Sequence, residues 1–144
     1  MRIPLALLTK KFDTGLVRKV YSKVQTLAAA PKKHPKLLYH NELVGGNVIL
    51  PTRIERLVDI GDPDIDTLFK HVHDLLEEIQ GVKLRLLKEK VNWKHGGGGI
   101  YLPHQDTPAF RPYGTDHVSA LVPFTEYTLT NGTLEIATNP WSHA

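Results

Sequence analysis

The hydrophobic period of the chain changes at Gly81, and this change constrains the fold more than any other feature. Before Gly81, apolar residues recur every three or four positions in two segments, which begin after Asp13 and Asp62. Such spacing predicts amphipathic helices, and aspartate is a favoured cap for a helix start. From Val82 to Lys94, apolar and polar residues alternate in a way that is typical of a strand. The sequence therefore predicts a fold of the α+β class.

Both predicted helices have recognisable ends. The first is expected to end at residues 28–30, because Pro31 cannot continue a helix. The second opens with Asp62-Pro63-Asp64, which suits a first turn, and Gly81 ends it. Residues 51–59 fit a strand or a helix. Short strands are expected at 37–40 and 47–50, a buried strand at 118–127, and a hairpin turn at Asn131-Gly132.

The composition fits one globular domain. The chain has 144 residues, of which 41% are hydrophobic and 23% are charged, so it can bury a core. It has no cysteine, which excludes disulfides and thiolate metal sites and is compatible with a cytoplasmic location. No targeting or membrane-spanning run is recognised. We therefore expect a single domain over residues 1–144 without a membrane partner.

Charge is unevenly distributed along the chain. Residues 1–40 hold nine lysines and arginines against one acid, whereas residues 61–80 hold six acids against Lys70. A basic region can attract a phosphate-bearing substrate or a nucleic acid. However, no aromatic interleaving or nucleic-acid module accompanies it, and a solvated basic helix face explains the pattern more simply. We expect no nucleic-acid partner.

A histidine and an aspartate lie two residues apart in Pro103-His104-Gln105-Asp106. Residues i and i+2 of a strand point to the same side of the sheet. On a strand, His104 and Asp106 can therefore present an imidazole and a carboxylate to one point. They match two of the three ligands in the 2-His-1-carboxylate facial triad of non-heme Fe(II) oxygenases. The glycines at 96–99 are expected to form a loop, and they are a weak signal for phosphate binding because they open no helix.

The predicted strand at 82–94 has two unlike faces near its end. Lys90 and Asn92 lie on one face, and Val91 and Trp93 lie on the other. Both faces change character near Leu86 and Leu87. A bulge, a face that passes from the core into a polar cavity, and an edge strand with its lysines in water all explain this pattern.

Several motifs follow one another in order from Lys88 to His143. They are Lys88-Glu89-Lys90-Val91-Asn92-Trp93-Lys94, the glycine run, Pro103-His104-Gln105-Asp106, Asn131-Gly132-Thr133-Leu134-Glu135-Ile136 and Trp141-Ser142-His143. In this ordered set the chain resembles the phytanoyl-CoA dioxygenase family of Fe(II)- and 2-oxoglutarate-dependent oxygenases. The resemblance implies N-terminal helices packed on an incomplete double-stranded β-helix, also called a jelly roll or cupin-like fold. Residues 1–81 would be the helical and strand lead-in, and residues 82–144 the first jelly-roll strands.

The resemblance also implies roles for individual residues. His104 and Asp106 would be the first two iron ligands, whereas His143 matches a turn histidine that does not bind the metal. The implied reaction is hydroxylation of a small organic substrate, with 2-oxoglutarate converted to succinate and CO2. The 2-oxoglutarate pocket would be bordered by Arg53, Lys90, Asn92, Ser119 and Val122.

Downstream of Asp106 the chain departs from the family pattern. Members of the family have a distal histidine ligand and an arginine for the far carboxylate of 2-oxoglutarate. Only 38 residues (144 − 106) follow Asp106, which is too few for the remaining strands of a jelly roll. We therefore expect the N-terminal portion of a longer oxygenase, inactive by itself.

Two alternatives are considered. The chain could be a shortened, non-catalytic homologue that acts as a binding or interaction domain and self-associates through exposed sheet edges. Alternatively, another histidine could replace the distal ligand. The candidates for that role are His95, His117 and His143.

Overall fold

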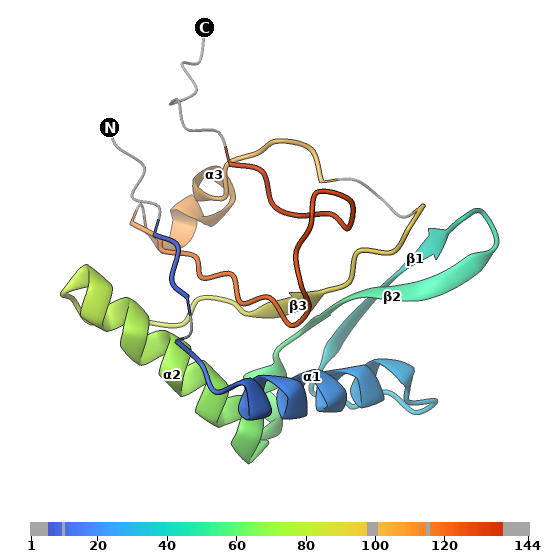
Figure 1. Cartoon of the computed structure of the whole chain (residues 1–144), viewed down its shortest axis with the longest axis horizontal. Helices are drawn as coiled ribbons and strands as arrows, with labels where there is room; N and C mark the ends of the chain where they lie inside the picture. Colours follow the sequence, from blue (N-terminus) through green and yellow to red (C-terminus); the bar gives the residue numbers. More distant parts are fainter. Residues whose placement is uncertain (1–5, 10, 98–100, 115, 137–144) are drawn as a thin grey trace, which may run out of the picture.

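The computed structural model describes residues 6–9, 11–97, 101–114 and 116–136. In these residues two long helices accompany a three-stranded antiparallel sheet of order β1-β2-β3, so the α+β class is confirmed (Figure 1). The elements are α1 (Thr14–Ala29), β1 (Leu38–Val44), β2 (Val48–Glu55), the 3-10 helix η1 (Leu57–Ile60), α2 (Pro63–Gln80), β3 (Lys90–Asn92), the short helix α3 (Thr107–Phe110) and the 3-10 helix η2 (Arg111–Tyr113).

Both long helices begin and end where the sequence predicts. The carboxylate of Asp13 accepts a hydrogen bond from the amide of Leu16 at 2.7 Å, which caps α1. Asp62 caps α2 in the same way by accepting from the amides of Asp64 and Ile65. Gly81 ends α2 in the left-handed conformation with φ of 66°, which glycine adopts without strain.

Asp62 also joins the two helices, because its carboxylate lies 2.7 Å from the ammonium group of Lys23 on α1. We expect Asp62→Ala to lower the free energy of unfolding by about 1 kcal/mol at neutral pH, since a cap is lost. The hydrogen bond from Lys23 lowers the pKa of Asp62 below its usual value. Its folded-state pKa is thus below its unfolded-state pKa, and the stabilisation must fade as the pH falls below about 4.

Urea denaturation of the wild type and of Asp62→Ala across this pH range measures the effect. Asp66→Ala is the matched control, since Asp66 is an exposed aspartate in the same helical turn that does not cap the helix. A stability difference for Asp62→Ala that persists unchanged under acid conditions contradicts the assignment.

The helices cover one face of the sheet. The side chain of Ile54 on β2 is fully buried, and it packs in one core with Val20 and Val24 of α1 and with Ile65 of α2. Val91, the register partner of Ile54, contacts the same core. In Figure 1 the two helices lie together below the strands, while much of the chain after β3 is drawn above them. Among the described residues, neither long helix packs on the opposite face of the sheet, which is called the open face below.

The strands at 37–40 and 47–50 are confirmed as parts of β1 and β2. Residues 51–59, which fit a strand or a helix by sequence, contain both: residues 51–55 extend β2 to Glu55, and η1 follows after Arg56. Arg56 has a φ of 70°, the left-handed conformation that turns the chain from the strand into η1.

The predicted strand at 82–94 is wrong in its extent, because only Lys90–Asn92 pair with a neighbour. Lys83 and Leu84 contact α2 instead, where the amide of Leu84 donates to the carboxylate of Glu77 at 2.9 Å. Glu89 accepts a hydrogen bond from the amide of Val58 in η1. Alternation of side chains is necessary for a strand, but a strand also requires a partner with free backbone groups. The bounds of β3 therefore follow from β2 and not from its own pattern.

The buried strand predicted at 118–127 is also wrong. Residues 116–128 form no strand, and most of them are exposed. This segment is held partly by Phe124, whose ring stacks on Tyr21 of α1 at a centroid distance of 5.8 Å. The hairpin predicted at Asn131-Gly132 is wrong: the amide of Asn131 donates to the carbonyl of Thr128, which closes a turn one step earlier, and no strands flank it. The described residues therefore form a small sheet and not a jelly roll.

Candidate metal and anion site on the open face of the sheet

Polar side chains gather on the open face of the sheet. Arg53 is the register partner of both His40 on β1 and Asn92 on β3, and Glu55 is the partner of Lys90. Directly paired residues of antiparallel strands lie on the same face, so these five side chains form two neighbouring rows. Arg53, Lys90 and Asn92, which the sequence grouped around a co-substrate, are thus brought together by the sheet. Of the three explanations for their strand, the structure fits the edge strand, because β3 is at the edge of the sheet and Lys90 and Lys94 are exposed.

Glu55 is the electrostatic centre of these rows. It is 7% exposed, and one of its oxygens lies 2.9 Å from Nε of Arg53 and 3.3 Å from Nε2 of His40. The other oxygen lies 3.1 Å from the ammonium group of Lys88. A buried carboxylate requires such partners because removing a charge from water is costly. Glu55 therefore fixes the surrounding cations in place.

The ring of His40 is oriented by its contact with Arg53. Its Nδ1 lies 3.2 Å from Nη2 of Arg53, and arginine can only donate. Nδ1 must therefore accept, which places the proton of the neutral ring on Nε2, on the side of Glu55. The Nε2 and Nε atoms that face Glu55 are not aligned for hydrogen bonds, so those contacts are electrostatic. Together, Glu55 and His40 hold the Arg53 guanidinium on two sides.

His40, Glu55 and Lys88 were missed by the sequence analysis. Glu55 stands two residues after Arg53, and it would have been found if residues 51–59 had been assigned to a strand. Lys88 was recognised as part of a motif, but its ion pair depends on the path of the chain after α2. His40 becomes a neighbour of Arg53 only through the register of β1 and β2.

That register contains a bulge. His40 pairs with Arg53 and Asn41 pairs with Pro51, so Thr52 is the extra residue. The hydroxyl of Thr52 donates to the carbonyl of His40 at 3.3 Å, which stabilises the irregularity. Bulges redirect side chains, and no local sequence pattern announces this one.

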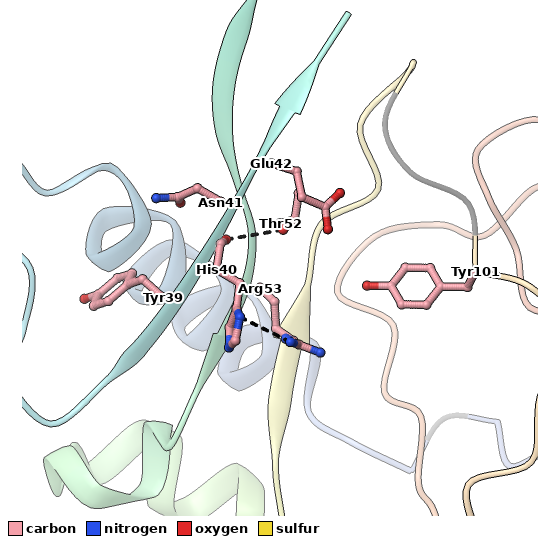
Figure 2. A pocket seen from close by; sticks show the side chains of 7 residues that line it. All are labelled: Tyr39, His40, Asn41, Glu42, Thr52, Arg53 and Tyr101. Carbon is pink, nitrogen blue, oxygen red and sulfur yellow. Dashed lines mark hydrogen bonds between the residues drawn. The ribbon is translucent and has the colours of Figure 1, made fainter. Parts of the chain in front are cut away.

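A pocket of about 460 Å³ opens beside Arg53. Figure 2 shows the side chains of Glu42 and Arg53 directed toward the side from which Tyr101 approaches, whereas Tyr39 and Asn41 point the other way. Tyr101 stands three residues before His104, so the segment that leads into the His-x-Asp motif lies against the open face. The lining residues are Tyr39, His40, Asn41, Glu42, Thr52, Arg53 and Tyr101.

His104 and Asp106 are close together, although not on a strand as predicted. Residues 101–106 are irregular, and Asp106 precedes α3. Nε2 of His104 lies 3.6 Å from a carboxylate oxygen of Asp106, and both side chains are more than half exposed. The carboxylate of Asp106 makes no capping hydrogen bond to α3, so it is free for another partner. The turn into α3, and not strand geometry, brings the two groups together.

The hydrogen bonding of His104 bears on its fit to a metal. Its Nδ1 lies 2.7 Å from the carbonyl of Leu102, which can only accept, so Nδ1 donates. Nε2 is the ring nitrogen that faces the Asp106 oxygen. A hydrogen bond from the far ring nitrogen to a carbonyl is typical of a metal-binding histidine.

The donor spacing can be compared with that of a metal site. Nitrogen and oxygen ligands lie about 2.0–2.2 Å from a first-row ion, so two ligands of one ion are about 3.0 Å apart at a right angle. The observed 3.6 Å is wider than this value by about 0.6 Å. A small approach of the two exposed side chains would therefore be needed to bring both donors to one ion.

A third ligand does not join them within the part of the chain that the structure describes. There, no group of three or more histidine, aspartate or glutamate residues is placed to hold a metal. His95 is engaged by the carbonyl of Pro51 at 2.8 Å, and the ring of His117 lies beside Phe110. His143 lies outside the described residues. Ser119 and Val122 lie in the irregular segment, without a shown contact to Arg53.

Among the described residues, no helix combines the length and apolar character needed to cross a bilayer.

Comparison with known proteins gives three relatives whose names describe dioxygenases or a hydroxylase. The chain is 31% identical over 113 residues to a methylphosphonate hydroxylase of Gimesia maris, covering 77% of this chain and 42% of that protein. It is 34% identical over 67 residues to a 2-aminoethylphosphonate dioxygenase of the uncultured bacterium HF130_AEPn_1, covering 46% of this chain and 26% of that protein. It is 29% identical over 69 residues to the dioxygenase lolE1 of Epichloe uncinata, covering 48% of this chain and 26% of that protein.

These matches are partial. No family model and no solved structure matches the chain. The chain spans less than half the length of each of these relatives. What the comparison establishes is that this chain is similar to part of proteins that are named as dioxygenases and a hydroxylase.

Proposed function

We propose that this chain carries part of the active site of a non-heme Fe(II)- and 2-oxoglutarate-dependent oxygenase that hydroxylates a small organic substrate. One observation supports the proposal: Nε2 of His104 and a carboxylate oxygen of Asp106 face each other 3.6 Å apart, near the spacing of two ligands of one metal ion. The names of the relatives support the reaction class. The resemblance to the phytanoyl-CoA dioxygenase family adds the choice of co-substrate.

In this proposal, separate groups of residues would bind the metal and the co-substrate. His104 and Asp106 would hold the iron and leave other coordination positions open for ligands. Lys90 and Asn92 would face 2-oxoglutarate, where a cation and an amide can bind its carboxylate. Arg53 stands between these two residues and the pocket. When bound, the iron supplies oxygen activation, which protein side chains do not provide.

Completion of the site would come from residues that correspond to the rest of the relatives. The matches cover 26% to 42% of those proteins, and the described residues hold two metal donors where a facial triad has three. We infer that the 144 residues alone bind the metal weakly and do not turn over. Ser119 and Val122 would reach the co-substrate only in the completed fold.

Anaerobic binding tests the proposal without requiring turnover. Fe(II) is titrated into the chain, and 2-oxoglutarate is then added while visible absorption is recorded. We expect iron to bind and the co-substrate to produce a new absorption band, with both signals lost in His104→Ala. His117→Ala is the matched control, because its imidazole is outside the motif. Iron binding that is unchanged in His104→Ala contradicts the proposal.

A non-catalytic role as an interaction domain is the second candidate. Large apolar side chains are exposed in the segment after β3, including Leu102 at 69% and Leu129 at 94%. Exposed apolar surface and free strand edges favour association. Sedimentation velocity over a range of protein concentrations distinguishes the two, since this role predicts a concentration-dependent oligomer. A compact monomer at every concentration argues against it.

A further inference from the structure

The pocket beside Arg53 contains opposite charges that do not neutralise each other. Glu42 and His40 are two residues apart on β1, and Arg53 is the register partner of His40. Among the described residues, Glu42 takes part in no ion pair. Figure 2 shows both its carboxylate and the Arg53 guanidinium on the side that faces Tyr101. The pocket thus has an anionic end and a cationic end.

At the cationic end, neighbouring side chains hold the Arg53 guanidinium in place before any ligand binds. Nε of Arg53 faces Glu55, and Nη2 donates to His40, so two sides of the guanidinium are fixed. Of the five N–H donors of arginine, those on the remaining edge are left for a ligand. A planar pair of such donors matches a carboxylate or phosphonate group. Tyr101 adds a hydroxyl, which is drawn pointing toward Arg53.

The anionic end selects against a second negative charge. A dicarboxylate such as 2-oxoglutarate, bound at Arg53, would bring its other carboxylate toward Glu42, where like charges repel. An amine at that position would instead pair with Glu42. Glu42 and Arg53 are diagonal neighbours on β1 and β2. Diagonal neighbours lie about 7–8 Å apart, so a spacer of roughly two or three carbons lets one small ligand reach both side chains.

We propose that this pocket binds a small zwitterion, with its oxyanion on Arg53 and its amine on Glu42. This inference rests on the proposed function, in which the zwitterion is the substrate and the co-substrate is left to Lys90 and Asn92. Glu55 is a positioning residue, because it orients the guanidinium and does not line the pocket, whereas His40 both orients the guanidinium and lines the pocket. The pocket itself contains none of the proposed metal ligands.

Isothermal titration of the metal-free chain tests the pocket separately from the iron site. The probes are 2-aminoethylphosphonate, ethylphosphonate, which lacks the amine, and 2-oxoglutarate. We expect the amine-bearing probe to bind about tenfold more tightly than ethylphosphonate, as one added charge-assisted hydrogen bond predicts. Glu42→Gln should remove this preference and leave ethylphosphonate binding unchanged, and Arg53→Gln should weaken both phosphonates about tenfold or more.

Two matched variants complete the design. Glu78→Gln removes an exposed carboxylate on α2 and should leave all affinities unchanged. Arg53→Lys should recover part of the affinity that Arg53→Gln loses, because it keeps the charge but not the paired donors. Equal affinities for the two phosphonates, an amine preference that survives Glu42→Gln, or no binding of either phosphonate overturns the inference.

The titration with 2-oxoglutarate tests whether the oxyanion bound at Arg53 belongs to the co-substrate or to the zwitterion. If 2-oxoglutarate binds this pocket most tightly and Glu42→Gln strengthens it, the pocket belongs to the co-substrate and the zwitterion assignment fails. The iron titration of His104→Ala is independent of these results. Failure of the pocket inference is therefore distinguishable from failure of the proposed function.

Discussion

Asp106→Ala is expected to weaken Fe(II) binding to this chain by more than about 100-fold. Loss of a residue that only orients a ligand costs about 10–100-fold in metal affinity, and loss of a ligand itself should exceed this. The structure describes two metal donors here, so removal of one leaves a single imidazole. Anaerobic calorimetric titration with Fe(II) measures the change.

The fold should survive this substitution. The Asp106 side chain makes no capping hydrogen bond to α3 and is more than half exposed. Circular dichroism and the urea midpoint should therefore match those of the wild type. Asp116→Ala is the control, because Asp116 is an exposed aspartate ten residues further along the chain. If Asp106→Ala and Asp116→Ala weaken iron binding equally, the metal is held by general surface charge and the assigned site is wrong.

Ile54→Ala is expected to lower the free energy of unfolding by about 2–5 kcal/mol, the cost of removing a fully buried aliphatic side chain. Ile54 is 0% exposed and joins both helices to the sheet in the core. Domains of this size are stable by only about 5–15 kcal/mol, so the loss is a large share of the total. Urea denaturation followed by circular dichroism gives the value.

Ile49→Ala is the matched control on the same strand. Ile49 is 71% exposed, and its truncation should change stability by no more than about 0.5 kcal/mol. Because Ile54 lies between Arg53 and Glu55 in sequence, its truncation should also loosen the open face and weaken phosphonate binding. Equal destabilisation by the two substitutions would mean that the helices do not pack on β2 as described.

The two long helices show which features of the fold can be predicted from local sequence. Asp13, Asp62 and Gly81 act through contacts within a few residues of themselves, and their positions fix the bounds of α1 and α2. The core face could likewise be recognised from the spacing of apolar residues. These features depend on short-range hydrogen bonds and on side-chain periodicity, which can be recognised in each segment by itself.

The strands show where this reasoning stops. Val82–Lys94 and residues 118–127 have patterns suited to strands, but a strand is stable only when its backbone groups are paired. In the described chain, β2 pairs with Lys90–Asn92, and residues 116–128 pair with no strand. The pattern identified possible strands, and the available partners decided which of them formed.

The candidate site divides in the same way. The sequence by itself determined the helix ends, the pairing of a histidine with an aspartate in one short motif, and the separation of Lys90 and Asn92 from the core. Tertiary structure alone decided that His40, Arg53 and Glu55 form one network, and that Glu42 and Tyr101 share a pocket with them. The physical reason is that strand register, the bulge at Thr52 and the return of the chain at Tyr101 are long-range contacts, which depend on packing and not on neighbouring residues.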